Sequence, residues 1–129
     1  MVKEEARNRM IRQLKVFKDA GLNVYINRVD RLTDSHYGII SDGKNIVYIQ
    51  FAEYGADTLF LMFFEYIPSI EYGSGVSFWD EGKAELTVED FKACVAYGKK
   101  KAAEYGAELY RSLDHYMGDP WHKKIFEKL

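Results

Sequence analysis

The spacing of apolar residues changes twice along this chain, and this change constrains the fold more than any other feature of the sequence. Apolar residues recur every three or four positions near the N-terminus, alternate in the middle, and return to the longer spacing towards the C-terminus. The longer spacing is typical of an amphipathic helix, and alternation is typical of a strand. The order predicts an α+β fold, in which helices from both ends of the chain pack on an antiparallel sheet of four to five strands.

The first helix is predicted over Lys3 to Ala20. Its apolar stripe has helical spacing and consists of Ala6, Met10, Ile11, Leu14 and Phe17. Gly21 follows the last turn, where a glycine commonly ends a helix because it adopts a left-handed conformation without strain. We therefore expect the chain to leave the helix at this glycine and to enter the first strand.

The middle of the chain is predicted to form short strands joined by hairpin connections. Asp42-Gly43 is a two-residue pattern that predicts a tight hairpin. A first strand through Val24 and Ile26 can extend to Arg28–Val29. The other predicted strands cover Tyr37–Ser41, Asn45–Ala52, Thr58–Ile67 and Val76–Asp80.

The C-terminal part is predicted to be helical again. Thr87 and Asp90 have the spacing of a capping box, in which two side chains satisfy amides at the start of a helix. An unbroken apolar stripe favours one long helix to about Met117. A break near Gly106 is the alternative, because each interior glycine costs about 1 kcal/mol relative to alanine. The stripe consists of Phe91, Val95, Gly98, Ala102, Tyr105, Leu109, Leu113 and Tyr116.

Small residues recur on one face of this helix and predict a close approach to the sheet. Gly98, Ala102 and Gly106 are spaced four apart, and their lack of bulk removes the usual obstacle to close packing. A short final helix is predicted after them, with Asp119 as its N-cap and Pro120 as its first residue.

The length of 129 residues is that of one domain, so residues 1–129 are interpreted as a single α+β domain. Aromatic residues make up 16% of the chain and include 10 tyrosines, whose apolar ring and polar tip suit a partly hydrated binding surface. Cys94 is the only cysteine, which excludes an internal disulfide and favours a core role in a reducing compartment. The sequence has neither a membrane-helix pattern nor a signal-peptide pattern, so we expect a cytoplasmic protein without a membrane partner.

Charge is divided unevenly along the chain, although the formal net charge is only −2. Residues 1–31 hold 8 basic and 4 acidic side chains, residues 32–91 hold 2 basic and 11 acidic, and residues 92–129 hold 8 basic and 5 acidic. One interpretation is that the acidic sheet region faces a basic partner. The alternative is that these acids are solvated or pair with the basic helices, since surface ion pairs of this kind are common.

The sequence contains no complete catalytic, metal or cofactor signature. The segment Asp114–His122 holds two histidines and two aspartates, but Gly118 and Pro120 interrupt the helix that would bring them together. The glycine-flanked loop Tyr72–Gly75 enters a strand, whereas phosphate-binding loops enter a helix. We therefore expect neither an enzyme nor a bound metal or cofactor.

Two segments resemble parts of a family of small uncharacterised proteins from phages, prophages and plasmids. Tyr37–Gln50 is similar to that family's hairpin, in which an aromatic-glycine strand turns at Asp-Gly and returns to a glutamine. Tyr72–Phe78 is similar to a loop that leads into a Gly-X-Gly-aromatic strand, but Pro68–Glu71 lacks the basic residues expected before it. The resemblance implies a mobile-element accessory protein, a group that includes inhibitors of host defence such as anti-CRISPR proteins.

We predict a non-enzymatic protein-binding module, of the type that a phage uses to inhibit a host nuclease or defence complex. Its partner would be a host protein or complex with a basic surface, and a homodimer is left open. The predicted contact residues lie on the acidic, tyrosine-rich sheet and its loops, and they are Tyr54, Asp57, Glu65, Glu71, Tyr72, Asp80 and Glu81.

Two alternatives belong to other classes of protein. A nucleic-acid-binding accessory protein would use the basic faces of the helices, through Arg7, Arg9, Arg12, Lys99, Lys100 and Lys101. The sequence pI near 5.9 is well below the basic range that is usual for such proteins. A small-molecule or nucleotide-binding domain would use a pocket between the sheet and a helix.

Overall fold

The computed structural model describes residues 2–27, 36–51, 57–65, 67, 75–78 and 85–129, with side chains from residue 7 onwards. This part of the chain contains four helices and six strands. The helices are α1 (Val2–Asp19), α2 (Val88–Tyr105), α3 (Leu113–Met117) and α4 (Pro120–Ile125). The strands are β1 (Asn23–Asn27), β2 (Tyr37–Ser41), β3 (Ile46–Gln50), β4 (Thr58–Met62), β5 (Gly75–Phe78) and β6 (Phe126–Lys128).

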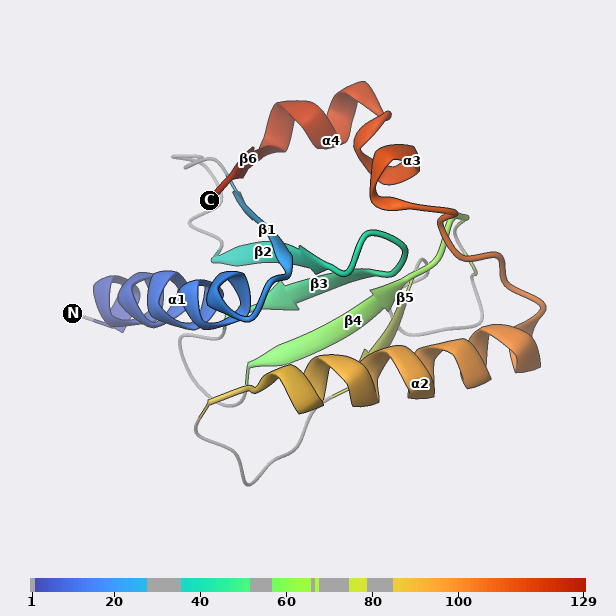
Figure 1. Cartoon of the computed structure of the whole chain (residues 1–129), viewed down its shortest axis with the longest axis horizontal. Helices are drawn as coiled ribbons and strands as arrows, with labels where there is room; N and C mark the ends of the chain where they lie inside the picture. Colours follow the sequence, from blue (N-terminus) through green and yellow to red (C-terminus); the bar gives the residue numbers. More distant parts are fainter. Residues whose placement is uncertain (1, 28–35, 52–56, 66, 68–74, 79–84) are drawn as a thin grey trace.

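The strands form one open antiparallel sheet with the order β5-β4-β3-β2-β1-β6 (Figure 1). The predicted α+β fold with an antiparallel sheet is confirmed, but the prediction of four to five strands is too low. The missing strand is β6, which pairs with β1 so that Phe126 lies opposite Asn27 and Lys128 opposite Tyr25. With only 3 residues, β6 is too short for an alternating pattern to be recognised in the sequence.

One face of the sheet is covered by α1 and α2 (Figure 1). Met10, Leu14 and Phe17 of α1 are fully buried there, as the apolar stripe predicted. Phe91 and Cys94 of α2 enter the same core. The sheet contributes Val24, Ile26, Ile40, Val47, Ile49, Leu59 and Leu61.

The opposite face is covered by the segment that follows α2, which includes α3 and α4 (Figure 1). The buried residues of this second core are Ile39, Ile46, Tyr116 and Phe126. Successive side chains of a strand point to opposite faces of a sheet, so Ile39 and Ile40 belong to different cores. The sheet is therefore enclosed between two layers of helices.

The predicted long C-terminal helix is wrong, and the alternative break near Gly106 is confirmed. α2 ends at Tyr105, and Gly106 follows it with a left-handed φ of 65°. The amide of Ala107 then donates to the carbonyl of Ala102 at 2.9 Å, which closes the end of the helix. The last apolar residue of the predicted stripe, Tyr116, belongs to α3 and packs in the second core.

Other predicted helix ends are confirmed. Thr87 and Asp90 form the capping box at the start of α2, and the amide of Thr87 donates to Asp90 Oδ2 at 2.6 Å. Asp119 is the N-cap of α4, and Pro120 is the first residue of that helix. Gly21 follows α1 with a left-handed φ of 93°. These ends follow from local side-chain chemistry, which is why the sequence was sufficient to find them.

The β2–β3 hairpin has a longer turn than the predicted two-residue one. Ser41 pairs with Ile46, so residues 42–45 form the connection and β3 begins at Ile46. Asp42 Oδ1 accepts hydrogen bonds from two amides that follow it in the turn, at 3.0 and 2.8 Å. The aspartate side chain thus organises the wider turn. β4 is also shorter than predicted and ends at Met62.

α2 packs closely against β4 at Gly98. A Cβ atom on Gly98 would lie 2.3 Å from Cδ2 and 2.5 Å from Cβ of Leu61. Gly98 and Ala102 are both buried, as the predicted face of small residues requires. Gly106 is exposed and a Cβ there would meet nothing within 4 Å, so it takes no part in the close packing.

Replacing Gly98 by alanine is expected to destabilise the protein, although alanine is favoured in a helix by about 1 kcal/mol. The added methyl group would overlap the Leu61 side chain, and such overpacking costs about 1–3 kcal/mol. We expect a net loss of about 1 kcal/mol in the free energy of unfolding, measured by urea titration. In a Leu61→Gly background, which removes every Leu61 atom that the methyl group would overlap, the same change should be neutral or stabilising. An equal loss in both backgrounds would contradict the predicted contact.

Candidate binding surfaces

The predicted protein-binding surface is described only in part. Tyr54, Glu71, Tyr72, Asp80 and Glu81 lie outside the described residues. Of the other two, Glu65 is exposed just beyond the end of β4. The side chain of Asp57 is only 6% exposed, so the two acids have different surroundings.

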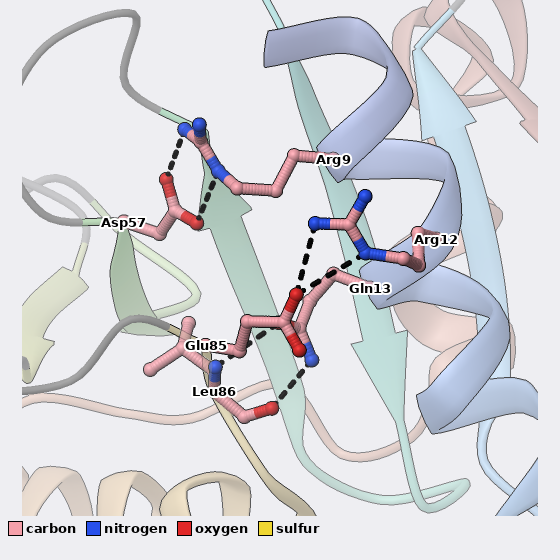
Figure 2. A network of polar contacts seen from close by, with 6 residues as sticks. All are labelled: Arg9, Arg12, Gln13, Asp57, Glu85 and Leu86. Atoms are coloured by element: carbon pink, nitrogen blue, oxygen red, sulfur yellow. Dashed lines mark hydrogen bonds and ion pairs between the residues drawn. The ribbon is translucent and has the colours of Figure 1, made fainter. Parts of the chain in front are cut away.

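Asp57 forms a two-point ion pair with Arg9 of α1 (Figure 2). Arg9 Nε donates to Asp57 Oδ2 at 3.0 Å, and Arg9 Nη2 donates to Asp57 Oδ1 at 2.8 Å. Two parallel hydrogen bonds of this kind are stronger than a single charged contact. The Arg9 side chain is 24% exposed, so the pair is partly shielded from solvent. Asp57 therefore joins the start of β4 to α1.

A second pair, Arg12 with Glu85, lies at the surface near the first (Figure 2). Arg12 Nη2 is 2.9 Å from Glu85 Oε1, and the two side chains are 60% and 51% exposed. Beside it, Gln13 is buried and forms two hydrogen bonds with the backbone of Leu86, one as donor and one as acceptor. Two acids of the middle segment, Asp57 and Glu85, therefore pair with the basic helix α1, as the alternative interpretation of the charge pattern predicted.

Three of the cations predicted for nucleic-acid binding are in ion pairs, and these are Arg9, Arg12 and Lys101. Lys101 donates to Glu104 on the same helix at 3.1 Å. Arg7 is half-buried, whereas Lys99 and Lys100 are exposed. Phosphate groups would therefore have to compete with carboxylates for half of this predicted set.

The two outer strands, β5 and β6, differ in charge. β6 contains Glu127 and Lys128, both exposed, and such charges protect a sheet edge against unwanted pairing. β5 has the sequence Gly-Val-Ser-Phe and no charged residue. Within the described part of the chain, no strand pairs with the outer side of β5. β5 is therefore the edge better suited to pairing with a strand from another molecule.

An exposed aromatic stripe lies on α2 near β5. Tyr97 and Tyr105 are 41% and 43% exposed, and Lys101 lies midway between them in the helix. The Tyr97 ring is 6.2 Å from the ring of Phe78 in β5, and Lys101 Nζ is 5.7 Å from the Tyr97 ring. The apolar spacing of α2 predicted that Tyr105 is buried, and the structure shows instead that it is exposed. Exposed aromatic residues of this type are common in protein interfaces.

The tyrosines of β2 and β3 belong to the second core. Tyr37 and Tyr48 have ring centres 5.2 Å apart, and Tyr48 packs on Phe60 of β4 at 5.7 Å. Burial and the neighbouring Tyr37 raise the pKa of Tyr48 above its ordinary value. The high tyrosine content of the chain is therefore explained in part by the packing of this face, and only in part by exposed residues.

The two C-terminal histidines have separate partners. The amide of Arg111 donates to His115 Nδ1 at 3.1 Å. His122 Nδ1 lies 2.7 Å from the carbonyl oxygen of Tyr116, and the two rings stack with centres 3.9 Å apart. Among the residues with a described placement, no three His, Cys, Asp or Glu side chains gather as metal ligands.

Cys94 is buried between α2 and the sheet, as its apolar neighbours in the sequence predicted. Burial raises the pKa of its thiol to about 12. A thiol with this pKa is almost fully protonated near neutral pH and cannot act as a nucleophile there. Its role in this structure is packing.

Comparisons of the chain with protein-family models, with curated proteins and with solved structures found no match. The resemblance to accessory proteins of phages and plasmids therefore stays a prediction. Among the described helices, none is both long enough and apolar enough to cross a membrane.

Replacing Arg9 by methionine is expected to destabilise the protein, because the Asp57 carboxylate would lose both hydrogen bonds from the guanidinium in a site that is only 6% exposed. We expect the free energy of unfolding to fall by about 1–3 kcal/mol. Arg12→Met is the matched control on the same helix, and its exposed pair should contribute less than about 1 kcal/mol. Equal losses for the two variants in urea titration would contradict the role assigned to burial.

Cys94 is expected to be unreactive in the folded protein. At about pH 8, a thiol with a pKa of about 12 is ionised to roughly one part in ten thousand, and burial also blocks access to the sulfur. Ellman's reagent should therefore label the thiol at a negligible rate in buffer and completely in concentrated guanidinium chloride. Labelling of the folded protein at the rate of free cysteine would show that the thiol is accessible.

Proposed function

We propose that this protein is a non-enzymatic protein-binding module that contacts its partner along the β5 edge of the sheet. The observation that carries the proposal is that β5 is an outer strand without a charged residue. The segments directly before and after β5 in the sequence hold four of the predicted contact residues, Glu71, Tyr72, Asp80 and Glu81.

An extended segment of the partner would pair with β5 and continue the antiparallel sheet. Backbone hydrogen bonds would supply affinity, and the acidic residues that precede and follow β5 in the sequence would select a partner with basic side chains. Phe78 and the exposed Tyr97 would add an apolar contact where α2 lies against this edge.

The class of partner follows from the resemblance to accessory proteins of mobile elements, among which are inhibitors of host defence. A nuclease presents a basic surface to its nucleic acid. An apolar, aromatic edge with acidic residues before and after it in the sequence can occupy such a surface and exclude the substrate. We therefore propose a host nuclease or defence complex with a basic surface as the partner.

Ser77→Lys places a charge within β5, which is the device by which natural edge strands resist pairing. Tagged protein would be used to capture partners from host lysate, and the captured proteins would be quantified by mass spectrometry. We expect the amount of the partner to fall by at least about tenfold with Ser77→Lys. Glu127→Lys is the matched control on the opposite edge, in β6, and it should retain the partner.

Charge reversal at Glu71 and Asp80 tests the acidic segments in the same capture experiment. Asp57 is left unchanged because its carboxylate is paired with Arg9. The assignment of this edge fails if the Ser77→Lys variant and the charge-reversed variant both remain folded, as judged by thermal unfolding, and both retain every captured protein. It also fails if Glu127→Lys loses the same protein, because the partner would then bind elsewhere.

A further inference from the structure

A cavity of about 230 Å³ lies where the chain beyond β4 meets the segment between α2 and α3. Its lining residues are Phe64, Glu108, Leu109, Arg111 and His115. The volume is below the roughly 300–1,000 Å³ of sites that bind drug-sized molecules. The cavity is therefore of a size for a smaller ligand.

Hydrogen bonds hold both sides of this cavity in place. Phe63 and Leu109 form an isolated antiparallel bridge, and the amide of Phe64 donates to the carbonyl of Glu108 at 2.8 Å. On the other side, the backbone amide of residue 111 donates to His115 Nδ1 at 3.1 Å. Because Nδ1 accepts this bond, the neutral imidazole carries its proton on Nε2 and has a donor there.

Arg111 and Glu108 bring opposite charges to the cavity, and both residues are exposed. Among the described residues, neither side chain is in an ion pair, with the other or with any third group. A guanidinium binds a carboxylate through two parallel hydrogen bonds. A carboxylate such as that of Glu108 binds an ammonium group in the same charge-assisted way.

Phe64 and Leu109 provide apolar surface beside these two charges. Phe64 is 41% exposed, and its ring lies 4.7 Å from the ring of His115 and 5.6 Å from that of Tyr110. The aromatic neighbours pack against the Phe64 ring, while part of its surface stays in contact with water. An apolar group of a ligand would displace that water with a gain in free energy.

We propose that this cavity binds a small zwitterion, an α-amino acid with an aromatic or large aliphatic side chain. Arg111 would bind the carboxylate, with His115 Nε2–H as a second donor. Glu108 would bind the ammonium group, and Phe64 and Leu109 would contact the side chain.

The two charged residues select against ligands with a single charge. A simple acid bound to Arg111 would bring its negative charge near Glu108, and a simple amine bound to Glu108 would bring its positive charge near Arg111. Only a ligand with both charges satisfies both residues, and this inference does not rest on the proposed partner of β5.

The test is a titration of the whole chain, followed by the amide resonances of residues 108–111 in NMR spectra. The probes are L-phenylalanine, L-leucine, 3-phenylpropanoate, which lacks the ammonium group, and 2-phenylethylamine, which lacks the carboxylate. We expect both amino acids to give saturable shifts. The Kd of L-phenylalanine should be at least about tenfold lower than that of either singly charged analogue.

Two variants separate the roles of the charged residues. Arg111→Gln should weaken L-phenylalanine binding by at least about tenfold. Glu108→Gln should also weaken L-phenylalanine but should strengthen 3-phenylpropanoate, because a like charge is removed. Lys99→Gln, on the exposed surface of α2, is the control and should change neither. All three replaced residues are exposed, and thermal unfolding checks that the variants are folded.

Three results would overturn the proposal. The first is the absence of shifts with either amino acid. The second is equal affinity for 3-phenylpropanoate and L-phenylalanine, which would indicate a simple anion site. The third is unchanged binding of L-phenylalanine by a folded Glu108→Gln variant, which would show that Glu108 does not bind the ammonium group.

Discussion

The central strands are buried on both faces of the sheet, and the rest of the structure depends on this double burial. Ile39 and Ile40 are adjacent in β2, point to opposite faces and are both 0% exposed. One layer of helices would leave half of these apolar side chains in water. α1 and α2 cover one face, so the chain must end α2 and pass to the other face, where α3, α4 and β6 complete the cover.

The features that could be predicted from the sequence are those set by local chemistry. The stripe of α1, the capping box of Thr87 and Asp90, and the N-cap Asp119 depend on residues close together in the chain. The long C-terminal helix could not be judged in this way. Tyr116 continues the apolar spacing of α2, yet α2 ends before the left-handed Gly106. The buried residues of α2 belong to the first core, and Tyr116 belongs to the second. Periodicity predicts burial, and wrongly so for Tyr105, but it does not show which face of the sheet buries a residue.

The candidate sites depended more strongly on tertiary structure. The uneven charge along the sequence was visible, but Asp57 and Arg9 are 48 positions apart and their pairing is known only from the fold. The exposure of Tyr97 and Tyr105 follows from the orientation of α2 on the sheet. The cavity near Phe64 is formed by a bridge between the chain after β4 and the chain after α2. No local pattern marks such a meeting of distant segments.

The pairing of β6 with β1 has a consequence for the order of synthesis. Ile26 lies opposite Glu127, so two strands that are neighbours in the sheet are made at widely separated times on the ribosome. While the C-terminal segment is still inside the ribosome, the edge of β1 and the apolar side chains of the second face have no cover. Exposed edges and apolar surfaces of this kind promote association between nascent chains. The first five strands thus pass through a vulnerable interval during translation, which lasts until β6 has emerged and paired with β1.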